Sequence, residues 1–246
     1  MIKDFFYLAF KNLKSRGVRS WLTLLGVFIG ITAVVSLISL GNGLELAVGS
    51  QFGISSSQLI TVQAGGISGF GPPGSFVVDP LTSQDSNAIE KLSSVENTVT
   101  RVIELAEIEF NNIIQFIYVG SAPNNKDDLD LIYSSLDLEV DHGRLLTESD
   151  SGKVVLGYHF YDKKEEWGGK QILAGKSINI NDKKFQVAGI LEQKGSFIFD
   201  HIILMPESDM SELFDFGNDV DLIIVEPKDK EEISKTREDI EDLLRD

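Results

Sequence analysis

The side chains best suited to chemistry in this sequence are a group of acids beside a histidine. Alternation along an expected strand places Asp137, Glu139 and Asp141 on one face, with His142 next to them. Oxygen ligands of this kind suit hard cations. The solvated side of a strand in an acidic chain has the same pattern, so we expect these acids to face water and to bind no metal.

No catalytic arrangement emerges from the other residues. The three histidines, His142, His159 and His201, lack the spacing of a zinc site, and the chain has no cysteine for a thiolate ligand or nucleophile. The sequence contains neither a Gly-x-Ser-x-Gly elbow nor a glycine-rich phosphate loop followed by Lys-Ser/Thr. We therefore expect a protein that is not an enzyme and holds no cofactor.

Charge is distributed unevenly along the chain. Of 22 basic and 38 acidic side chains, five basic ones and one acidic one lie in the first 42 residues. Residues 43–246 therefore carry a net charge of −20. A surface this negative repels nucleic acid, which excludes nucleic acid as a partner.

The residues from Trp21 to Leu40 are uncharged and mostly apolar. An α-helix of this length is about 30 Å long, which matches the hydrocarbon core of a membrane. A buried helix of a soluble protein rarely runs so far without a polar face. We expect a transmembrane helix over residues 21–43; a signal peptide cleaved near Ala47-Val48-Gly49 is the alternative.

Basic residues predict the orientation of this helix. All five near the span precede it, and the next one along the chain is Lys91. Because cationic flanks stay in the cytoplasm, the N-terminus is expected inside the cell membrane and residues after about 43 outside. The residues expected to set this topology at the inner leaflet are Lys11, Lys14, Arg16 and Arg19.

Residues 1–20 are expected to form a basic amphipathic segment on the cytoplasmic side. Apolar residues recur at helical spacing from Ile2 to Leu13, with the lysines largely on the other side. This pattern suits a short helix lying on membrane lipid. A basic flank without defined structure is the alternative.

Within the span, Gly26 and Gly30 are followed at helical spacing by Ala33 and Ser36. A stripe of small residues lets another helix approach closely, and in lipid such close packing drives helix association. The stripe therefore predicts a helix-packing surface.

The rest of the chain alternates between expected strands and helices. Strands are expected at residues 59–62, 99–110, 113–119, 154–156, 177–180, 185–190, 202–205 and 219–225. Asn111-Asn112 and Asn181-Asp182 are expected to form turns between strands. The fold class is α+β: one N-terminal transmembrane helix, then a mixed α/β extracytoplasmic domain over residues 44–246 with a β-rich inserted subdomain at about 120–206.

Two helices in this domain have recognisable starts. Thr82-Ser83-Gln84-Asp85 is typical of a capping box. The helix that follows is expected to bury Ala88, Ile89, Leu92 and Val95. Asp229 with Glu232 is expected to cap a last helix that ends at Leu244. The buried side of that helix is expected to be Ile233, Ile240, Leu243 and Leu244.

Two stretches resemble the MacB/FtsX-type family of ABC transporter permeases. The first comprises Ala9-Phe10-Lys11-Asn12-Leu13, Arg19-Ser20-x-Leu22-Thr23-x-Leu25-Gly26-x-x-x-Gly30 and Ser39-Leu40-Gly41-x-Gly43-Leu44. The second comprises Gly143-Arg144-x-Leu146-Thr147-Glu148-x-Asp150, Val154-Val155-Leu156-Gly157, Gly175, Phe185-x-Val187-x-Gly189-Ile190 and Met205-Pro206.

The resemblance implies a permease subunit with four transmembrane helices and a MacB-like core domain between the first two. It also implies a second permease copy, in a homo- or heterodimer, and a cytoplasmic ABC ATPase subunit that moves the outer domain mechanically to export or release a substrate. The sequence stops at Asp246, so it is expected to be the N-terminal part of such a permease. A single-pass membrane-anchored binding or sensing module without transport activity is the alternative.

The basic flank provides a test of topology. Replacing Lys11, Lys14, Arg16 and Arg19 with neutral residues is expected to weaken the N-inside preference, because it removes the cationic residues closest to the span. Protease added to intact cells or spheroplasts should digest residues beyond about 50 in the unaltered chain and spare a tag at Met1. Digestion of that tag would contradict the assignment.

Overall fold

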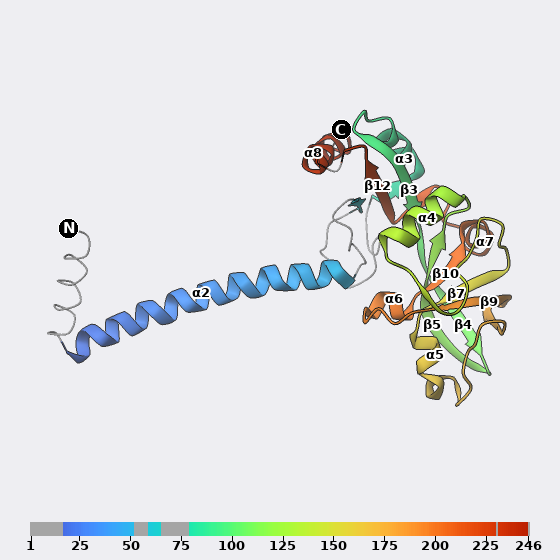
Figure 1. Cartoon of the computed structure of the whole chain (residues 1–246), viewed down its shortest axis with the longest axis horizontal. Helices are drawn as coiled ribbons and strands as arrows, with labels where there is room; N and C mark the ends of the chain where they lie inside the picture. The colour runs from blue at the N-terminus through green and yellow to red at the C-terminus, as the bar shows by residue number, and fades with distance from the viewer. Residues whose placement is uncertain (1–16, 52–58, 65–78, 230, 246) are drawn as a thin grey trace. The chain divides into compact units, whose positions relative to one another are not determined.

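The computed structural model of the chain describes residues 17–51, 59–64, 79–229 and 231–245. The chain divides into two units, Met1–Gly49 and Ser50–Asp246. Figure 1 shows the long helix of the first unit and the mixed α/β second unit. Residues 1–16 of the amphipathic segment expected over 1–20 lie outside the described residues, and its last three residues belong to the long helix that starts at Val18.

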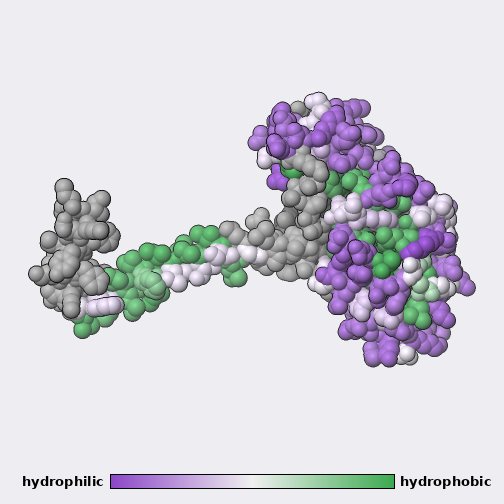
Figure 2. Space-filling view, in the orientation of Figure 1, coloured by the Kyte–Doolittle hydropathy of each residue, from purple (hydrophilic) through white to green (hydrophobic). Residues whose placement is uncertain are grey.

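The first unit contains helix α2, which runs without interruption from Val18 to Gln51. Its segment Ser20–Gly41 is long and apolar enough to cross a membrane, and none of that segment is buried against the rest of the protein. Apolar side chains cover the helix in the space-filling view of Figure 2. Because so much exposed apolar surface is unfavourable in water, this helix suits a lipid environment.

The second unit begins with a three-stranded antiparallel sheet in the order β1 (Ile60–Val62), β12 (Leu222–Pro227), β3 (Val95–Arg101). Helix α3 (Ser83–Glu90) contacts strand β3 of this sheet, and helix α8 (Ile233–Leu243) contacts α3 (Figure 1). Neighbouring residues of β12 point to opposite faces, so Ile223 and Ile224 enter different hydrophobic clusters. The sheet is therefore buried on both faces.

The larger sheet has seven strands in the order β6-β9-β7-β10-β5-β4-β8, and β8 also pairs with β9. Its strands are β4 (Ile103–Phe110), β5 (Ile113–Ala122), β6 (Val140–Gly143), β7 (Lys153–Leu156), β8 (Ser177–Ile180), β9 (Lys183–Leu191) and β10 (Ile203–Pro206). Pairs β10–β5 and β7–β9 are parallel, and the others are antiparallel. The extra β8–β9 pairing closes six strands into a barrel, with β6 outside the ring.

The barrel encloses fully buried side chains such as Ile108, Val119, Phe185 and Ile203. Short helices surround it: α4 (Lys126–Ser135), α5 (His159–Asp162), α6 (Phe197–His201), α7 (Glu207–Leu213) and the 3₁₀-helix η1 (Lys164–Trp167). The expected α+β fold is therefore confirmed. The barrel strands span 103–206, and the subdomain boundary near residue 120 stays a prediction.

The predicted capping box and both predicted two-residue turns are confirmed. Thr82 accepts a hydrogen bond from the Asp85 backbone N–H at the start of α3, and the Asp85 carboxylate accepts one from Thr82 in return. The two-residue turns Asn111-Asn112 and Asn181-Asp182 join β4 to β5 and β8 to β9, with positive φ at all four residues. Such φ values are typical of tight hairpins.

Other expectations about the helices were wrong. Helix α3 ends at Glu90, so Val95 lies in strand β3 rather than on the buried side of that helix. In α8 the side chain of Ile240 is buried, but Leu243 and Leu244 are exposed. Glu232 occupies the N-cap of α8, but its side chain makes no capping hydrogen bond and instead accepts one from Lys235. Periodicity located these helices but overextended their buried faces.

The loop after β6 is organised around one buried carboxylate. Both oxygens of Asp150 accept hydrogen bonds from the Arg144 guanidinium, at 2.6 and 2.7 Å, and Asp150 also accepts one from the Thr147 backbone N–H. The Arg144 hydrogen bonds hold the pKa of Asp150 well below its usual range. Gly143 starts this loop at φ +82, where a Cβ would lie 2.2 Å from the Ala188 carbonyl oxygen. The Gly143–Asp150 motif is therefore a structural element.

At Val102 the backbone passes directly from the three-stranded sheet into the seven-stranded sheet. Strand β3 ends at Arg101 and β4 starts at Ile103, so the expected single strand over residues 99–110 is divided between two sheets at Val102. The strand expected at 219–225 is likewise divided at Asp221, into β11 (Asp219–Val220) and β12. Strand β11 pairs with β2 (Leu81–Thr82). Sequence alternation did not reveal either change of sheet.

Hydrogen bonds join Asp221, where the second strand is divided, to the residues on both sides of Val102, where the first is divided. The Asp221 backbone N–H donates to the Arg101 carbonyl at 3.0 Å, and the Asp221 carboxylate accepts from the Ile103 N–H at 2.6 Å. Burial raises the pKa of Asp221 to about 6, with further increases from the charges of Glu104 and Asp219. One partly buried carboxylate therefore holds the crossing together.

This raised pKa makes a prediction for Asp221→Asn. Because the folded state binds the proton more tightly than the unfolded state, Asp221 adds stability at low pH that is lost as pH rises through about 6. Asparagine keeps an oxygen acceptor for Ile103 but has no charge to bury. The melting temperature of the variant minus that of the unaltered chain should therefore fall by a few degrees between pH 7.5 and 5.

Glu96→Gln is the matched control, because Glu96 is an exposed carboxylate on the same strand β3. The melting temperature of Glu96→Gln minus that of the unaltered chain should change little over the same pH range. If Asp221→Asn showed a constant difference from pH 5 to 7.5, the Asp221 carboxyl would not titrate in this window.

Candidate functional site

The first candidate site is the stripe of small residues on α2. Gly26, Gly30, Ala33 and Ser36 are all exposed on the described helix, and a Cβ added at either glycine would meet no atom within 4 Å. The stripe is therefore geometrically open to an approaching helix. Its role in helix packing stays a prediction.

The residues expected to set topology are only partly visible. Lys11, Lys14 and Arg16 lie outside the described residues, and Arg19 lies in α2 without a described side chain. Their contacts with the inner leaflet therefore also stay a prediction.

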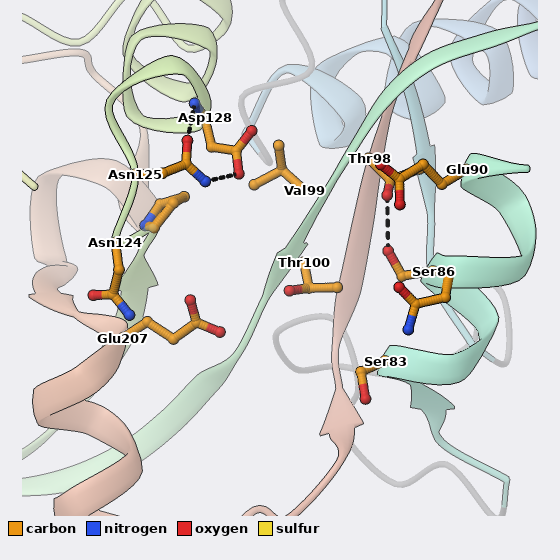
Figure 3. Close-up of a pocket in the computed structure, with 12 residues that line it drawn as sticks. Ser83, Ser86, Glu90, Thr98, Val99, Thr100, Asn124, Asn125, Asp128 and Glu207 are labelled. Atoms are coloured by element: carbon orange, nitrogen blue, oxygen red, sulfur yellow. Dashed lines mark hydrogen bonds between the residues drawn. The ribbon is translucent and has the colours of Figure 1, made fainter.

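A second candidate is an open cavity of about 360 Å³ in the second unit. Helix α3 and strand β3 contribute one part of its wall, and the segment before α4 and the start of α7 contribute the other. Figure 3 shows Glu207 pointing towards Thr100 across this space. Its lining residues are Ser83, Ser86, Asn87, Glu90, Thr98, Val99, Thr100, Pro123, Asn124, Asn125, Asp128 and Glu207.

Several polar groups at the cavity wall already have partners. Asp128 accepts hydrogen bonds from the side-chain amides of Asn97, at 2.8 Å, and Asn125. The Ser86 and Thr98 hydroxyls are 3.0 Å apart. The lining residues include no histidine, cysteine or lysine that could act as a catalytic base or nucleophile. The cavity therefore offers hydroxyl, amide and carboxylate groups for hydrogen bonding.

A buried arginine influences the charge at this wall. The Arg101 side chain is only 6% exposed, and its Nε has no hydrogen-bond partner among the described residues. Burial lowers the pKa of Arg101 to about 10, so it remains protonated at neutral pH. Burial also raises the pKa of Glu207, an effect that the Arg101 charge opposes. Desolvation raises the pKa of the nearby Tyr133 to about 12.

The acids Asp137, Glu139 and Asp141 beside His142 form no metal site among the described residues. Asp137 adopts a positive φ of 49° before β6 rather than the strand conformation expected for it. The Asp141 Oδ2 atom lies 3.5 Å from Nε2 of the neighbouring His142. Within the described ranges, no group of three or more histidine, cysteine, aspartate or glutamate side chains is placed to hold a metal ion.

Two of the histidines contact each other unexpectedly. The rings of His159 and His201 have their centroids 3.8 Å apart and their planes tilted by 30°, and His159 Nε2 lies 3.0 Å from the Glu166 carboxylate. Sequence spacing gave no signal of this contact, because α5 and α6 bring distant segments together. Arg101 was also missed, although it alternates with buried Val99 along β3, a position where burial is predictable.

Comparison with known proteins identifies the fold and the family. The family model of the MacB-like periplasmic core domain matches residues 20–243. The second unit resembles the periplasmic region of MacB from Actinobacillus actinomycetemcomitans. That structure aligns at a TM-score of 0.56 and 20% identity, over 78% of this chain and 85% of that one. The likeness to this structure shows the shared fold.

Curated relatives agree with the family match. An uncharacterised ABC transporter permease of Methanocaldococcus jannaschii is 30% identical over 99% of this chain and 59% of its own length. The pyoverdine export ATP-binding/permease protein PvdT of Pseudomonas aeruginosa is 29% identical over 92% of this chain and 33% of its own. The chain thus spans about three-fifths of the first relative and one-third of the second.

The family model covers both the apolar helix from Ser20 onward and nearly all of the second unit. The chain therefore belongs to the family of ABC transporter permeases with a MacB-like periplasmic core domain.

Proposed function

We propose that this chain is a membrane subunit, or the N-terminal part of one, in an ABC-type permease. A partner ATPase in the cytoplasm moves its outer domain mechanically, and this motion exports or releases a substrate. The observation that carries the proposal is the single family match, which includes the apolar helix and the domain together. The separate ATPase is part of this proposal; residues 1–246 contain no glycine-rich phosphate loop with Lys-Ser/Thr to which ATP binding could be assigned.

The proposed arrangement places residues 1–20 in the cytoplasm, residues 21–43 in the cell membrane and residues 44–246 outside. The asymmetric distribution of basic residues supports this orientation. The apolar segment Ser20–Gly41 supports the position of the span. A second permease copy and membrane lipid complete the proposed surroundings.

Helix α2 has a property that suits mechanical coupling. It continues for ten residues beyond Gly41 without a break, to Gln51. At about 1.5 Å per residue, this extension is about 15 Å long. Because an unbroken helix is stiff along its axis, a displacement of the span is carried to the start of the outer unit.

Purification from the native cell tests the proposed ATPase partner. A tagged chain solubilised in mild detergent should co-purify with an ATP-binding subunit, and the complex should hydrolyse ATP. The chain purified alone should neither hydrolyse ATP nor melt at a higher temperature when ATP is added, since a ligand bound by the native state stabilises it. A chain that repeatedly purifies without an ATPase would favour the membrane-anchored binding or sensing module.

The small-residue stripe provides a second test. Gly30→Leu should disrupt association with another permease helix, because a bulky side chain separates the two backbones and removes many packing contacts. Insertion should be unaffected, since leucine adds apolar surface. The chain contains no cysteine, so a single introduced Ala33→Cys can report association by cross-linking in membranes.

Val27→Leu is the matched control, because Val27 lies off the stripe and the change adds a similar side chain. At equal expression, cross-linking at position 33 should fall several-fold for Gly30→Leu and change little for Val27→Leu. Equal cross-linking of both variants would show that the stripe is ordinary membrane-helix composition.

A further inference from the structure

Strand β5 carries a column of large apolar side chains on the outside of the barrel. Ile114, Phe116 and Tyr118 are 54%, 67% and 41% exposed. They occupy alternate positions and so share one face of the sheet. Leu105, directly opposite Tyr118 on β4, is also 50% exposed. Scattered apolar residues are normal on a surface, but a contiguous column indicates an interaction site.

The backbone of the same residues faces away from β4. Phe110 and Ile113 flank the two-residue turn and form a hydrogen-bonded pair, after which bonded and non-bonded pairs alternate. The Ser121 N–H donates to the Val102 carbonyl at 2.9 Å, which matches this alternation. Odd-numbered residues of β5 therefore bond towards β4, and the N–H and C=O groups of Ile114 and Phe116 point to the opposite edge.

That opposite edge is open along half of β5. Strand β10 pairs with β5 only over residues 119–122, and no strand in the described part of the chain pairs with residues 113–118 on this side. Figure 1 shows the β4–β5 hairpin extending beyond β10. Among the described residues, the backbone groups of Ile114 and Phe116 have no other backbone partner. An unpaired strand edge of this kind is a template for another strand.

Acidic side chains flank the open edge on both faces of β5. On the outer face, Glu107 lies opposite Phe116 and Glu109 lies opposite Ile114. On the inner face, the Gln115 side chain reaches the Glu166 carbonyl, so the exposed acids of η1 lie close to this strand. Within η1 the two acids Glu165 and Glu166 outnumber the one base, Lys164, although Glu166 also pairs with His159. Together with Glu107 and Glu109 they give a negative balance that favours a cationic partner, in agreement with the net charge of −20 on residues 43–246.

We propose that the open edge of β5 receives an extended segment of a partner protein by β-strand addition. Alternate apolar side chains of that segment pack beside Ile114 and Phe116, and the intervening positions carry Lys or Arg towards the acids of η1. Main-chain hydrogen bonds to Ile114 and Phe116 supply affinity, while the side-chain alternation supplies specificity. A second copy of this chain fits poorly, because pairing two β5 edges brings two acidic surfaces together. The inference is independent of the proposed ATPase.

A ten-residue peptide of alternating Val and Lys serves as the probe. Fluorescence anisotropy measures its binding to the full chain in a neutral detergent, which removes binding to anionic lipid as an explanation. The alternating peptide should bind saturably and at least tenfold more tightly than two controls. One control alternates Val and Glu; the other has the same Val and Lys content arranged in pairs, which prevents one apolar face in a strand.

Two variants distinguish the contribution of the Phe116 backbone N–H to peptide binding from that of its ring. Phe116→Ala removes the apolar ring but keeps the N–H, whereas Phe116→Pro removes both and leaves the ladder to β4 intact. The proline variant should bind the peptide at least tenfold more weakly than the alanine variant. Leu173→Ala, an exposed apolar residue outside the barrel strands, should leave binding unchanged.

A peptide N-methylated at alternate residues tests the same hydrogen bonds on the unaltered chain, should Phe116→Pro fail to fold. Its binding should fall at least tenfold, and the unmodified peptide should slow amide exchange at Ile114 and Phe116. Equal binding of the alternating and paired peptides, or no loss on N-methylation, would overturn the proposal. So would a peptide-independent dimer that Phe116→Pro abolishes, since it would make a second copy the occupant.

Discussion

The architecture depends on one short crossing in which the backbone leaves the three-stranded sheet and enters the barrel. Arg101, Val102 and Ile103 make this passage inside the protein, where every unpaired backbone group is costly. The passage is tolerated because Val102 exchanges hydrogen bonds with Ser121, while Asp221 bonds to the residues on either side. The same polar groups that satisfy the backbone thus define how the two sheets join.

A buried cation beside this crossing adds a second constraint. Arg101 is desolvated, the charge of Glu207 at the start of α7 favours its protonated form, and Tyr133 of α4 lies nearby with its pKa raised to about 12. A cation in this position costs less when the neighbouring carboxylate stays ionised, and burial works against that ionisation. The charge balance at the cavity wall therefore depends on α7, which packs on β10 and β5 and carries Glu207.

Local chemistry was largely predictable from the sequence. The Asn turns, the Thr82 capping box and most strands have short-range causes, so a window of a few residues contains the signal. The sheet changes at Val102 and Asp221 could not be predicted, because alternation continues through a strand that exchanges partners. The contact between His159 and His201 and the open edge at Phe116 depend on which distant segments meet, information that no local pattern contains.

A short pairing between strands β4 and β8 closes the barrel. Strands β4 and β8 share only two residue pairs, Ile108 with Ile180 and Glu109 with Asn179, separated by about seventy positions in the sequence. The β4–β5 and β8–β9 hairpins, by contrast, are each closed by a two-residue turn and form from local contacts. Long-range pairing carries a larger loop-closure entropy than a hairpin. By this argument we expect the two hairpins to form before the pairings of distant strands, β4 with β8 and β5 with β10.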